Sequence, residues 1–237
     1  MESPNLKFNK DFIKNKIYDC EASSRTKLND NFFTRAAILF SIVPYEDKPY
    51  DLILIHRTNR GLRHRGEISF PGGKLEKKDR SLRDTALRET CEEIGVSKGN
   101  IEVIGCLNDF PTMTKYIIRP FVGLIDERSE LIREKREVQK ILKVPIDFFT
   151  SKTNFREKAF NINDDKFPVF YFNYKEKSNN KIYTIWGATA HMIVSFIELV
   201  YDFKMSELGI KRFDLEKIKA LKNYIKYKDK ITRNIRE

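Results

Sequence analysis

Apolar and polar residues follow one another along this chain in patterns that predict both strands and helices. Residues 36–43 and 52–56 form two apolar runs separated by the turn-forming stretch 45–50, an arrangement that predicts a β-hairpin. Further strands are predicted at residues 101–107, 117–125, 169–172 and 182–186. These strands indicate a curved sheet at the centre of the fold.

Helical periodicity marks the regions between and around the strands. Ser81, with an acid three residues on, resembles a capping box and Gly95 offers a left-handed C-cap, so a helix is predicted over residues 81–94. A mostly apolar helix is predicted at 187–200, and a short helix or turn at 137–149. Two amphipathic helices are predicted from the spacing of Leu6, Ile13 and Ile17 and from that of Leu215, Ile218, Leu221 and Ile225.

The order of these elements predicts an α+β fold with one main domain. We expect residues 1–31 to form a basic, helical N-terminal extension and residues 32–204 to form the domain itself. Beyond Met205 the chain has ten basic and five acidic residues. Residues 205–237 are therefore expected to form a basic helical extension packed on the domain.

The composition narrows the class of protein. A hydrophobic fraction of 41% among 237 residues supplies a packed core, and no apolar run approaches the roughly 18 residues that cross a bilayer. The first residues lack the basic start and apolar core of a secretory signal. Cys20, Cys91 and Cys106 lie singly, which argues against a disulfide framework and fits the reduced cytoplasm. The net charge of +11 suits an anionic partner: nucleic acid, a phosphorylated small molecule or a membrane surface.

Three carboxylates gather on one face of the helix predicted at 81–94. Glu89, Glu92 and Glu93 are spaced i, i+3 and i+4 and fall within an arc of roughly 100°. Such like charges repel one another unless a cation lies between them, and Mg²⁺ or Mn²⁺ suits these oxygen ligands. From the spacing alone, a solvated acidic helix face remains the alternative.

The residues around this helix resemble the signature of the Nudix hydrolases. That signature places a glycine and an acid ahead of R-E-U-x-E-E-x-G-U, where U is apolar, and the matching residues are Gly73, Asp79, Arg88, Glu89, Glu92, Glu93, Gly95 and Val96. Thr90 stands at the first U position, and Gly73 and Asp79 each lie one residue early relative to Arg88. The resemblance implies a Nudix fold, a mixed curved β-sheet flanked by helices in an α/β/α sandwich.

The early glycine and acid, together with residues outside the signature, look like the coenzyme A pyrophosphatase branch of that family. The upstream run 57–73 is similar to the branch's R-S…H-x-G-[QE]-[IV]-x-F-P-G-G, and residues 137–149 and 185–190 also look like the branch. Arg63 lies one residue later than the branch's usual arginine, and Arg65 replaces a small residue. The substrate-binding residues that the resemblance implies are Arg57, Arg63, His64, Arg65 and Gly73.

The resemblance also implies roles on the carboxylate helix. Glu92, Glu89 and Arg88 are the expected catalytic residues. Mg²⁺ or Mn²⁺ is expected on Glu89, Glu93 and Glu92, with Glu92 serving either as a ligand or as the general base. Glu137 and Asp79 are the candidates for an additional acid.

The implied reaction is the Mg²⁺-dependent hydrolysis of the pyrophosphate of coenzyme A or its derivatives to 4′-phosphopantetheine and adenosine 3′,5′-bisphosphate. The alternative is a Nudix hydrolase of NADH, ADP-ribose, a dinucleoside polyphosphate or capped RNA. A third hypothesis, a silent module that binds nucleic acid, leaves three mutually repelling carboxylates unexplained. We therefore expect a small-molecule substrate, no nucleic acid and no membrane, and leave a homodimer open. Trp186 is expected in the core or along the substrate channel, and Cys91 in the packing.

Overall fold

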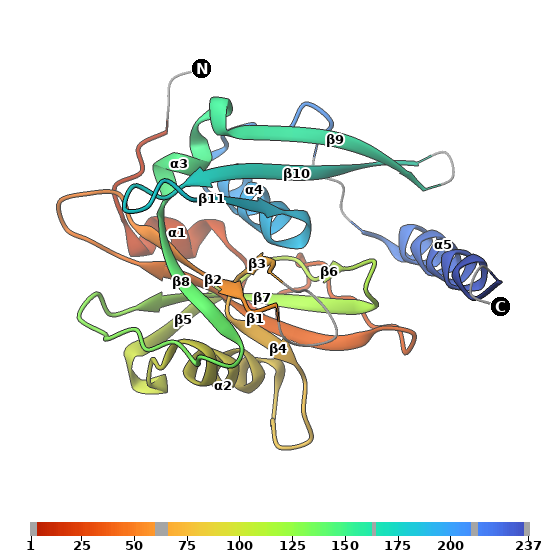
Figure 1. Cartoon of the computed structure of the whole chain (residues 1–237), viewed down its shortest axis with the longest axis horizontal. Coiled ribbons are helices and arrows are strands. Elements are labelled where there is room, and N and C mark those ends of the chain that lie inside the picture. The colour runs from red at the N-terminus through yellow and green to blue at the C-terminus, as the bar shows by residue number, and fades with distance from the viewer. Residues whose placement is uncertain (1–3, 60–65, 163–164, 210–212, 235–237) are drawn as a thin grey trace.

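The fold is built on a mixed central sheet and a smaller second sheet (Figure 1). The computed structural model describes residues 4–59, 66–162, 165–209 and 213–234. Within these residues the central sheet contains β1 (Thr34–Val43), β2 (Asp51–Arg57), β3 (Ile68–Ser69), β4 (Gly72–Lys74), β5 (Ile101–Cys106), β6 (Phe110–Pro111), β7 (Tyr116–Ile125) and β8 (Val138–Pro145). The second sheet contains β9 (Phe155–Ile162), β10 (Asp165–Lys175) and β11 (Ile182–Trp186).

Strand β1 is the middle of the central sheet because it pairs along both edges. It runs parallel to β7 on one edge, and on the other it runs antiparallel to β4 and then to β2. Residues 36–43 are all buried, as their unbroken apolar run predicts. β8 pairs antiparallel with β2, and β5 with β7, so the sheet is mixed as expected.

Helices cover both faces of the central sheet. They are α1 (Lys10–Lys16), α2 (Leu82–Ile94), α3 (Ile146–Thr150), α4 (Gly187–Tyr201) and α5 (Leu215–Asn234), with 3₁₀ turns at Lys98–Asn100 and Lys152–Asn154. In Figure 1, α2 lies below the central sheet and α4 lies between that sheet and the second one. The second sheet thus adds a layer to the expected α/β/α sandwich.

Two apolar cores hold the central sheet between its helices. Leu39 of β1 packs in one core with Ala86 and Ile94 of α2. On the opposite face, Phe40 stacks on Phe196 of α4 with ring centroids 4.6 Å apart. Because successive side chains of a strand point to opposite faces, adjacent residues of β1 supply both cores. The position of α2 against the sheet follows directly from this alternation.

One predicted element is wrong, although the hairpin, the other predicted strands and the helices at 81–94 and 187–200 are confirmed. Only residues 146–150 form a short helix, α3, whereas residues 138–145 form strand β8 instead of the predicted helix or turn. The segment becomes a strand because it pairs with β2 from Pro145 back to Val138. Lys140 interrupts its apolar alternation and finds a partner in Glu176, 2.5 Å away on the second sheet.

Residues 18–28, here called the strap, are fastened to the end of β5. Tyr18 and Cys106 exchange two backbone hydrogen bonds of 3.1 and 2.9 Å. Cys20 and Cys106 form a disulfide, so the prediction of unpaired cysteines is wrong, and the inference of a reduced compartment loses its premise. The two residues are 86 positions apart, so no local spacing indicates the pair. Arg25 binds Asp109 at 2.6 Å beside the disulfide.

The C-terminal helix α5 packs against β9 of the second sheet and shares a core with Ile117 of β7. Ile218, Leu221 and Ile225 lie in a third apolar core with Leu28 and Phe33. This apolar stripe is the one that the helical spacing predicts.

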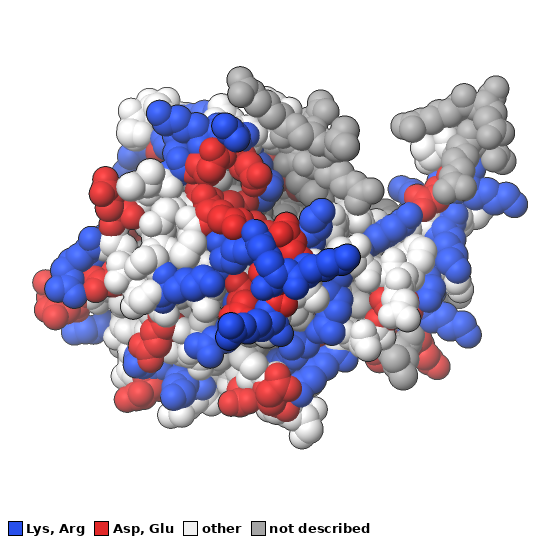
Figure 2. Space-filling model, turned by 90° about the horizontal axis from the view of Figure 1, so that it is seen from below, with Lys and Arg blue, Asp and Glu red and all other residues white. Residues whose placement is uncertain are grey.

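The surplus positive charge is not gathered in one patch on the α2 side of the molecule. Seen from that side, Lys and Arg side chains are interspersed with Asp and Glu over the main body, and further basic side chains lie along α5 (Figure 2). Among the described helices, none is long and apolar enough to cross a membrane.

Candidate active site

Helix α2 is fixed at both ends by the caps that its sequence predicts. The Ser81 hydroxyl accepts a hydrogen bond from the Asp84 N–H at 3.1 Å. At the other end Gly95, with a φ of 75°, donates its N–H to the Cys91 carbonyl at 3.0 Å. With its apolar flank in the core, the helix presents its acidic face to strand β4.

Glu93 lies behind this face and braces the glycine corner at residues 72–73. Its carboxylate accepts one hydrogen bond from Arg57 Nη1 at 2.8 Å and one from the Gly72 N–H at 2.9 Å. The residue is 1% exposed. Burial raises the pKa of this carboxyl to about 7, although Arg57 and the Gly72 N–H oppose the rise. Glu93 thus ties α2 to both β2 and β4.

The glycine corner lets β4 lie directly against its neighbours. A Cβ on Gly73 would overlap the Glu89 carboxylate, and a Cβ on Gly72 would overlap the backbone of β1 at Ala37 and Ile38. Any side chain at these two positions would push α2 and β1 away. The absence of a side chain at Gly73 therefore leaves the space that the Glu89 carboxylate occupies.

Arg88 holds three acids at once, in a cluster that we call the Arg88 node. Its Nε and Nη2 bind the two oxygens of Asp79 at 2.8 and 2.9 Å, and its Nη1 binds Glu89 at 2.9 Å and Glu92 at 3.0 Å. Asp79 also accepts the Thr85 hydroxyl at 3.0 Å. The guanidinium holds the pKa of Asp79 well below its usual range. Asp79 is therefore engaged in orienting the arginine.

Glu89 and Glu92 are the carboxylates of the node that reach open space. The Glu92 side chain is 51% exposed and that of Glu89 is 14% exposed. Burial raises the pKa of Glu89, Arg88 opposes the rise, and the charges of Glu92 and Glu137 add to it. These like charges share one arginine, which is the electrostatic situation that a divalent cation relieves.

The carboxylates of α2 supply donors suited to a hard cation. Within the described residues, no three His, Cys, Asp or Glu side chains already form a metal-binding group. Oxygens of Glu89 and Glu92 face Arg88 instead, and those of Glu93 face Arg57 and Gly72. Carboxylate oxygens are nevertheless the ligands that Mg²⁺ and Mn²⁺ prefer, and mutual repulsion favours a cation among them. The residues fit a divalent ion.

A cleft of about 860 Å³ opens beside these carboxylates, a volume typical of small-molecule sites. Its polar end is lined by Arg57, Gly72, Gly73, Arg88, Glu89, Glu92 and Glu137. Glu137 is exposed and lies 4.0 Å from Arg57 Nη2. Trp186 is 44% exposed and also lines the cleft. Of the two predictions for this residue, the one that placed it in the core is wrong, and its position along the cleft agrees with the other.

The other predicted residues divide into those in the cleft and those outside the described part of the chain. Arg57 and Gly73 are at the polar end, as the resemblance implies for substrate contacts. Arg63, His64 and Arg65 lie outside the described residues, and their contacts stay predictions. Cys91 packs as expected, with its thiol donating to the Val96 carbonyl at 2.8 Å.

The opposite end of the cleft is apolar, and sequence reasoning does not find it. Its residues include Phe110, Phe160, Phe167, Phe213 and Leu221. They come from β6, β9, β10 and the C-terminal segment, so no spacing within one element connects them. Among them only Leu221 belongs to a predicted pattern, the stripe of α5, and that pattern indicates packing.

Residues 34–164, more than half of the chain, match the family model of the NUDIX domain. The chain belongs to the Nudix family. Nudix hydrolases generally use divalent metal ions, in agreement with the oxygen donors around the Arg88 node.

Three relatives illustrate the range of similarity of this Nudix chain. It is 30% identical over 172 residues to Nudix hydrolase 15, mitochondrial, of Arabidopsis thaliana, covering 71% of this chain and 59% of the relative. It is 32% identical over 168 residues to the uncharacterized Nudix hydrolase NudL of Photorhabdus laumondii, covering 70% and 84%. It is 29% identical over 189 residues to the peroxisomal coenzyme A diphosphatase NUDT7 of Mus musculus, covering 77% and 79%. The chain thus spans less than two thirds of the length of the Arabidopsis relative.

Proposed function

We propose that this Nudix chain hydrolyses the diphosphate of coenzyme A or of a coenzyme A derivative, releasing 4′-phosphopantetheine and adenosine 3′,5′-bisphosphate. The observation that carries the proposal is the Arg88 node at the polar end of a cleft of about 860 Å³. The choice of coenzyme A is supported by the 29% identity, over 77% of this chain, to a relative that is named a coenzyme A diphosphatase.

The carboxylates of α2 and two arginines have assigned roles in this reaction. When bound, Mg²⁺ or Mn²⁺ neutralises the diphosphate and lowers the pKa of the attacking water. Glu89 and Glu93 are the carboxylates assigned to hold the ion. Glu92 is the most exposed of the three, and its Oε1, 3.4 Å from Lys78, is the atom assigned to accept the proton of the water. Arg88 keeps Glu89 and Glu92 oriented, and Arg57 binds a substrate phosphate.

A substrate screen tests the proposal. The protein is incubated with Mg²⁺ and, in separate reactions, with coenzyme A, NADH, ADP-ribose, diadenosine tetraphosphate or capped RNA, and products are identified by mass spectrometry. We expect preferential release of 4′-phosphopantetheine, and no release when the metal is chelated. Cleavage of the other nucleotides without coenzyme A would reject the substrate, whereas affinity for RNA without any cleavage would reject the enzyme.

A charge-neutral variant tests the role of Glu92. Glu92→Gln should lower kcat on the order of 10²- to 10⁴-fold, because the general base is lost while the side-chain volume is kept. Glu102→Gln is the matched control, because Glu102 is an exposed carboxylate of β5 that pairs with Lys10 outside the cleft. Wild-type kcat in Glu92→Gln would reject the assignment.

A further inference from the structure

The end of the cleft away from the Arg88 node is lined by apolar side chains from several elements. They are Phe110 of β6, Ile118 of β7, Phe160 and Ile162 of β9, Phe167 of β10, Phe213 just before α5, and Leu221 of α5. Hydrolysis at the diphosphate uses none of these side chains. Phe167, Phe213 and Leu221 also lie beyond residue 164, where the family match ends, so membership in the family assigns them no role.

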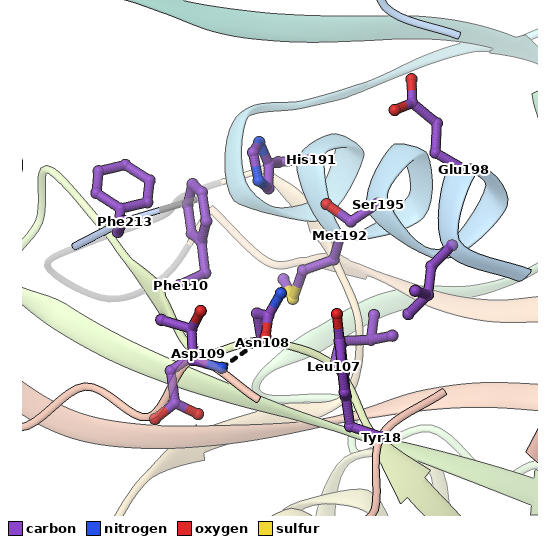
Figure 3. Close-up of a pocket in the computed structure, with 12 residues that line it drawn as sticks. Tyr18, Leu107, Asn108, Asp109, Phe110, His191, Met192, Ser195, Glu198 and Phe213 are labelled. Atoms are coloured by element: carbon purple, nitrogen blue, oxygen red, sulfur yellow. Dashed lines mark hydrogen bonds between the residues drawn. The ribbon is translucent and has the colours of Figure 1, made fainter. Parts of the chain in front are cut away.

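Phe213 is held in this wall by two other rings. It stacks on Phe167 with centroids 5.5 Å apart and meets Phe110 edge to face at 5.7 Å. The ring centroid of Phe110 in turn lies 4.4 Å from that of His191. Phe213, Phe110 and His191 also line an adjoining cavity of about 280 Å³ (Figure 3). Burial lowers the pKa of His191 to about 4, so its ring is neutral near pH 7 and the wall carries no charge.

Leu221 reaches this end of the cleft from α5. It lines the cleft but is only 2% exposed, so it supports the wall and contributes little open surface of its own. The helix is held by its buried apolar stripe in the third core, and two partly exposed ion pairs, Lys222 with Asp30 at 3.0 Å and Lys115 with Asp229 at 2.6 Å, add to this. The helix therefore forms a fixed wall of the cleft.

A ligand that binds only at the diphosphate would leave the partly exposed side chains of this lining, those of Phe110, Ile118, Phe160 and Phe213, in contact with water. Burying apolar surface is favourable, so a ligand that also carries an apolar group gains affinity here. Because one cleft joins the two ends, a single molecule can occupy both.

We propose that the apolar end is a subsite for an apolar group carried by the substrate, and that Phe213 and Leu221 set its depth. The inference rests on the proposed function, since in a coenzyme A derivative this group is the acyl chain on the sulfur. The C-terminal helix then selects among substrates, while the Arg88 node acts on all of them.

A comparison of one long-chain acyl-coenzyme A with free coenzyme A tests the depth of the subsite. The ratio of kcat/KM for dodecanoyl-coenzyme A to that for free coenzyme A is measured in the wild type and in Leu221→Trp and Leu221→Ala. We expect the larger side chain to lower this ratio about tenfold and the smaller one to raise it, because each methylene in an apolar pocket changes discrimination by at least that order. Equal ratios in the three proteins would overturn the inference.

The matched control is Ile225→Ala, one turn further along α5. Ile225 is buried to the same extent in the same apolar core but does not belong to the cleft lining among the described residues. It should lower the melting temperature as Leu221→Ala does and leave the ratio unchanged. A shift of the ratio in Ile225→Ala equal to that in Leu221→Ala would assign the effect to helix docking and overturn the subsite.

A binding measurement separates the inference from the proposed function. The fluorescent probe anilinonaphthalene sulfonate is titrated without metal, so no turnover is needed. Dodecanoyl-coenzyme A should displace the probe from the wild type, and Leu221→Trp should weaken probe binding, whereas Ile225→Ala should not. If the screen shows no cleavage of any coenzyme A form, the proposed function fails; if probe affinity is unchanged in Leu221→Trp, the subsite fails.

Discussion

Two arginine–aspartate pairs in this protein are built from the same groups and placed in opposite surroundings. The Arg88 node lies in the cleft wall, and beyond Asp79 its arginine binds carboxylates that reach open space. The pair of Arg25 and Asp109, here called the strap node, is closed, with side chains 0% and 1% exposed. Further donors of Arg25 bind backbone carbonyl groups. An open pair can orient reacting groups, whereas a closed pair contributes to stability alone.

The strap node also differs from the Arg88 node in the number of groups that bind its aspartate. Asp109 accepts hydrogen bonds from Arg25, from Arg119 at 3.0 Å and from the Leu28 N–H at 3.0 Å. The single negative charge therefore compensates two cations. The two pairs therefore differ in exposure and in their remaining partners, and on the proposed function only the open pair takes part in catalysis.

The largest effect is expected at the strap node. Asp109→Asn removes the charge that compensates buried Arg25, and breaking a buried ion pair typically costs about 3–5 kcal/mol of unfolding free energy. The loss is measured by urea denaturation, with kcat per folded molecule as the second readout. Unchanged stability, or a loss of kcat at full stability, would break the comparison.

The next largest effect is expected at the disulfide of the strap. Removing it tests the covalent link to β5 separately from the ion pair of Arg25 and Asp109. Cys20→Ser removes a cross-link between residues 86 positions apart, which should lower the unfolding free energy by about 3 kcal/mol. A reductant should destabilise the wild type by a similar amount and leave Cys20→Ser unaffected. Cys91→Ser, which removes the unpaired cysteine, should keep the sensitivity to reductant. A wild type that is insensitive to reductant would contradict the disulfide.

The equivalent Asp→Asn substitution at the Arg88 node should lower kcat and have a smaller effect on the unfolding free energy. Asp79→Asn withdraws the bidentate partner of Arg88, which can then shift and misplace Glu89 and Glu92. Because a misplacement near 1 Å can cost about a hundredfold in rate, we expect kcat to fall by about that factor with a smaller loss of stability than at Asp109. Asp84→Asn, in the first turn of α2, is the control. Full activity in Asp79→Asn would contradict the proposal that the node orients Glu89 and Glu92.

The smallest effect is expected at the ion pair between the two extensions. Lys222 and Asp30 lie 3.0 Å apart with partly exposed side chains, and exposed pairs contribute at most about 1 kcal/mol. Lys222→Ala should therefore lower the melting temperature slightly, and the loss should shrink in high salt. A loss as large as that of Asp109→Asn would show that exposure does not separate the two kinds of pair.

Sequence patterns predicted those parts of the fold whose causes are local. The caps of α2 lie within its own sequence, and the unbroken apolar run of β1 follows from burial on both faces. Strand β9 escaped prediction because its residues are mostly part-exposed or exposed and charged residues interrupt the apolar ones. It is a strand because it pairs with β10 along its whole length.

The same distinction holds in the candidate site. Arg88, Glu89 and Glu92 lie within one turn and a half of one helix, so their cluster is visible in the sequence. Arg25 and Asp109 are 84 residues apart, and only the folded chain brings them together. Leu221 was visible as an apolar position of a helix, but the cleft behind it is formed by other elements.

The fastening of the strap has a consequence for the order in which the chain assembles during its synthesis. Residues 18–28 leave the ribosome before residues 106–109, yet the disulfide, the bridge at Tyr18 and the pair at Arg25 all need residues 106–109. The segment that is made early therefore docks late. Cys91 emerges before Cys106 and could capture Cys20 in the interval. In the folded chain the Cys91 thiol donates to the Val96 carbonyl at 2.8 Å, and Cys20 pairs with Cys106.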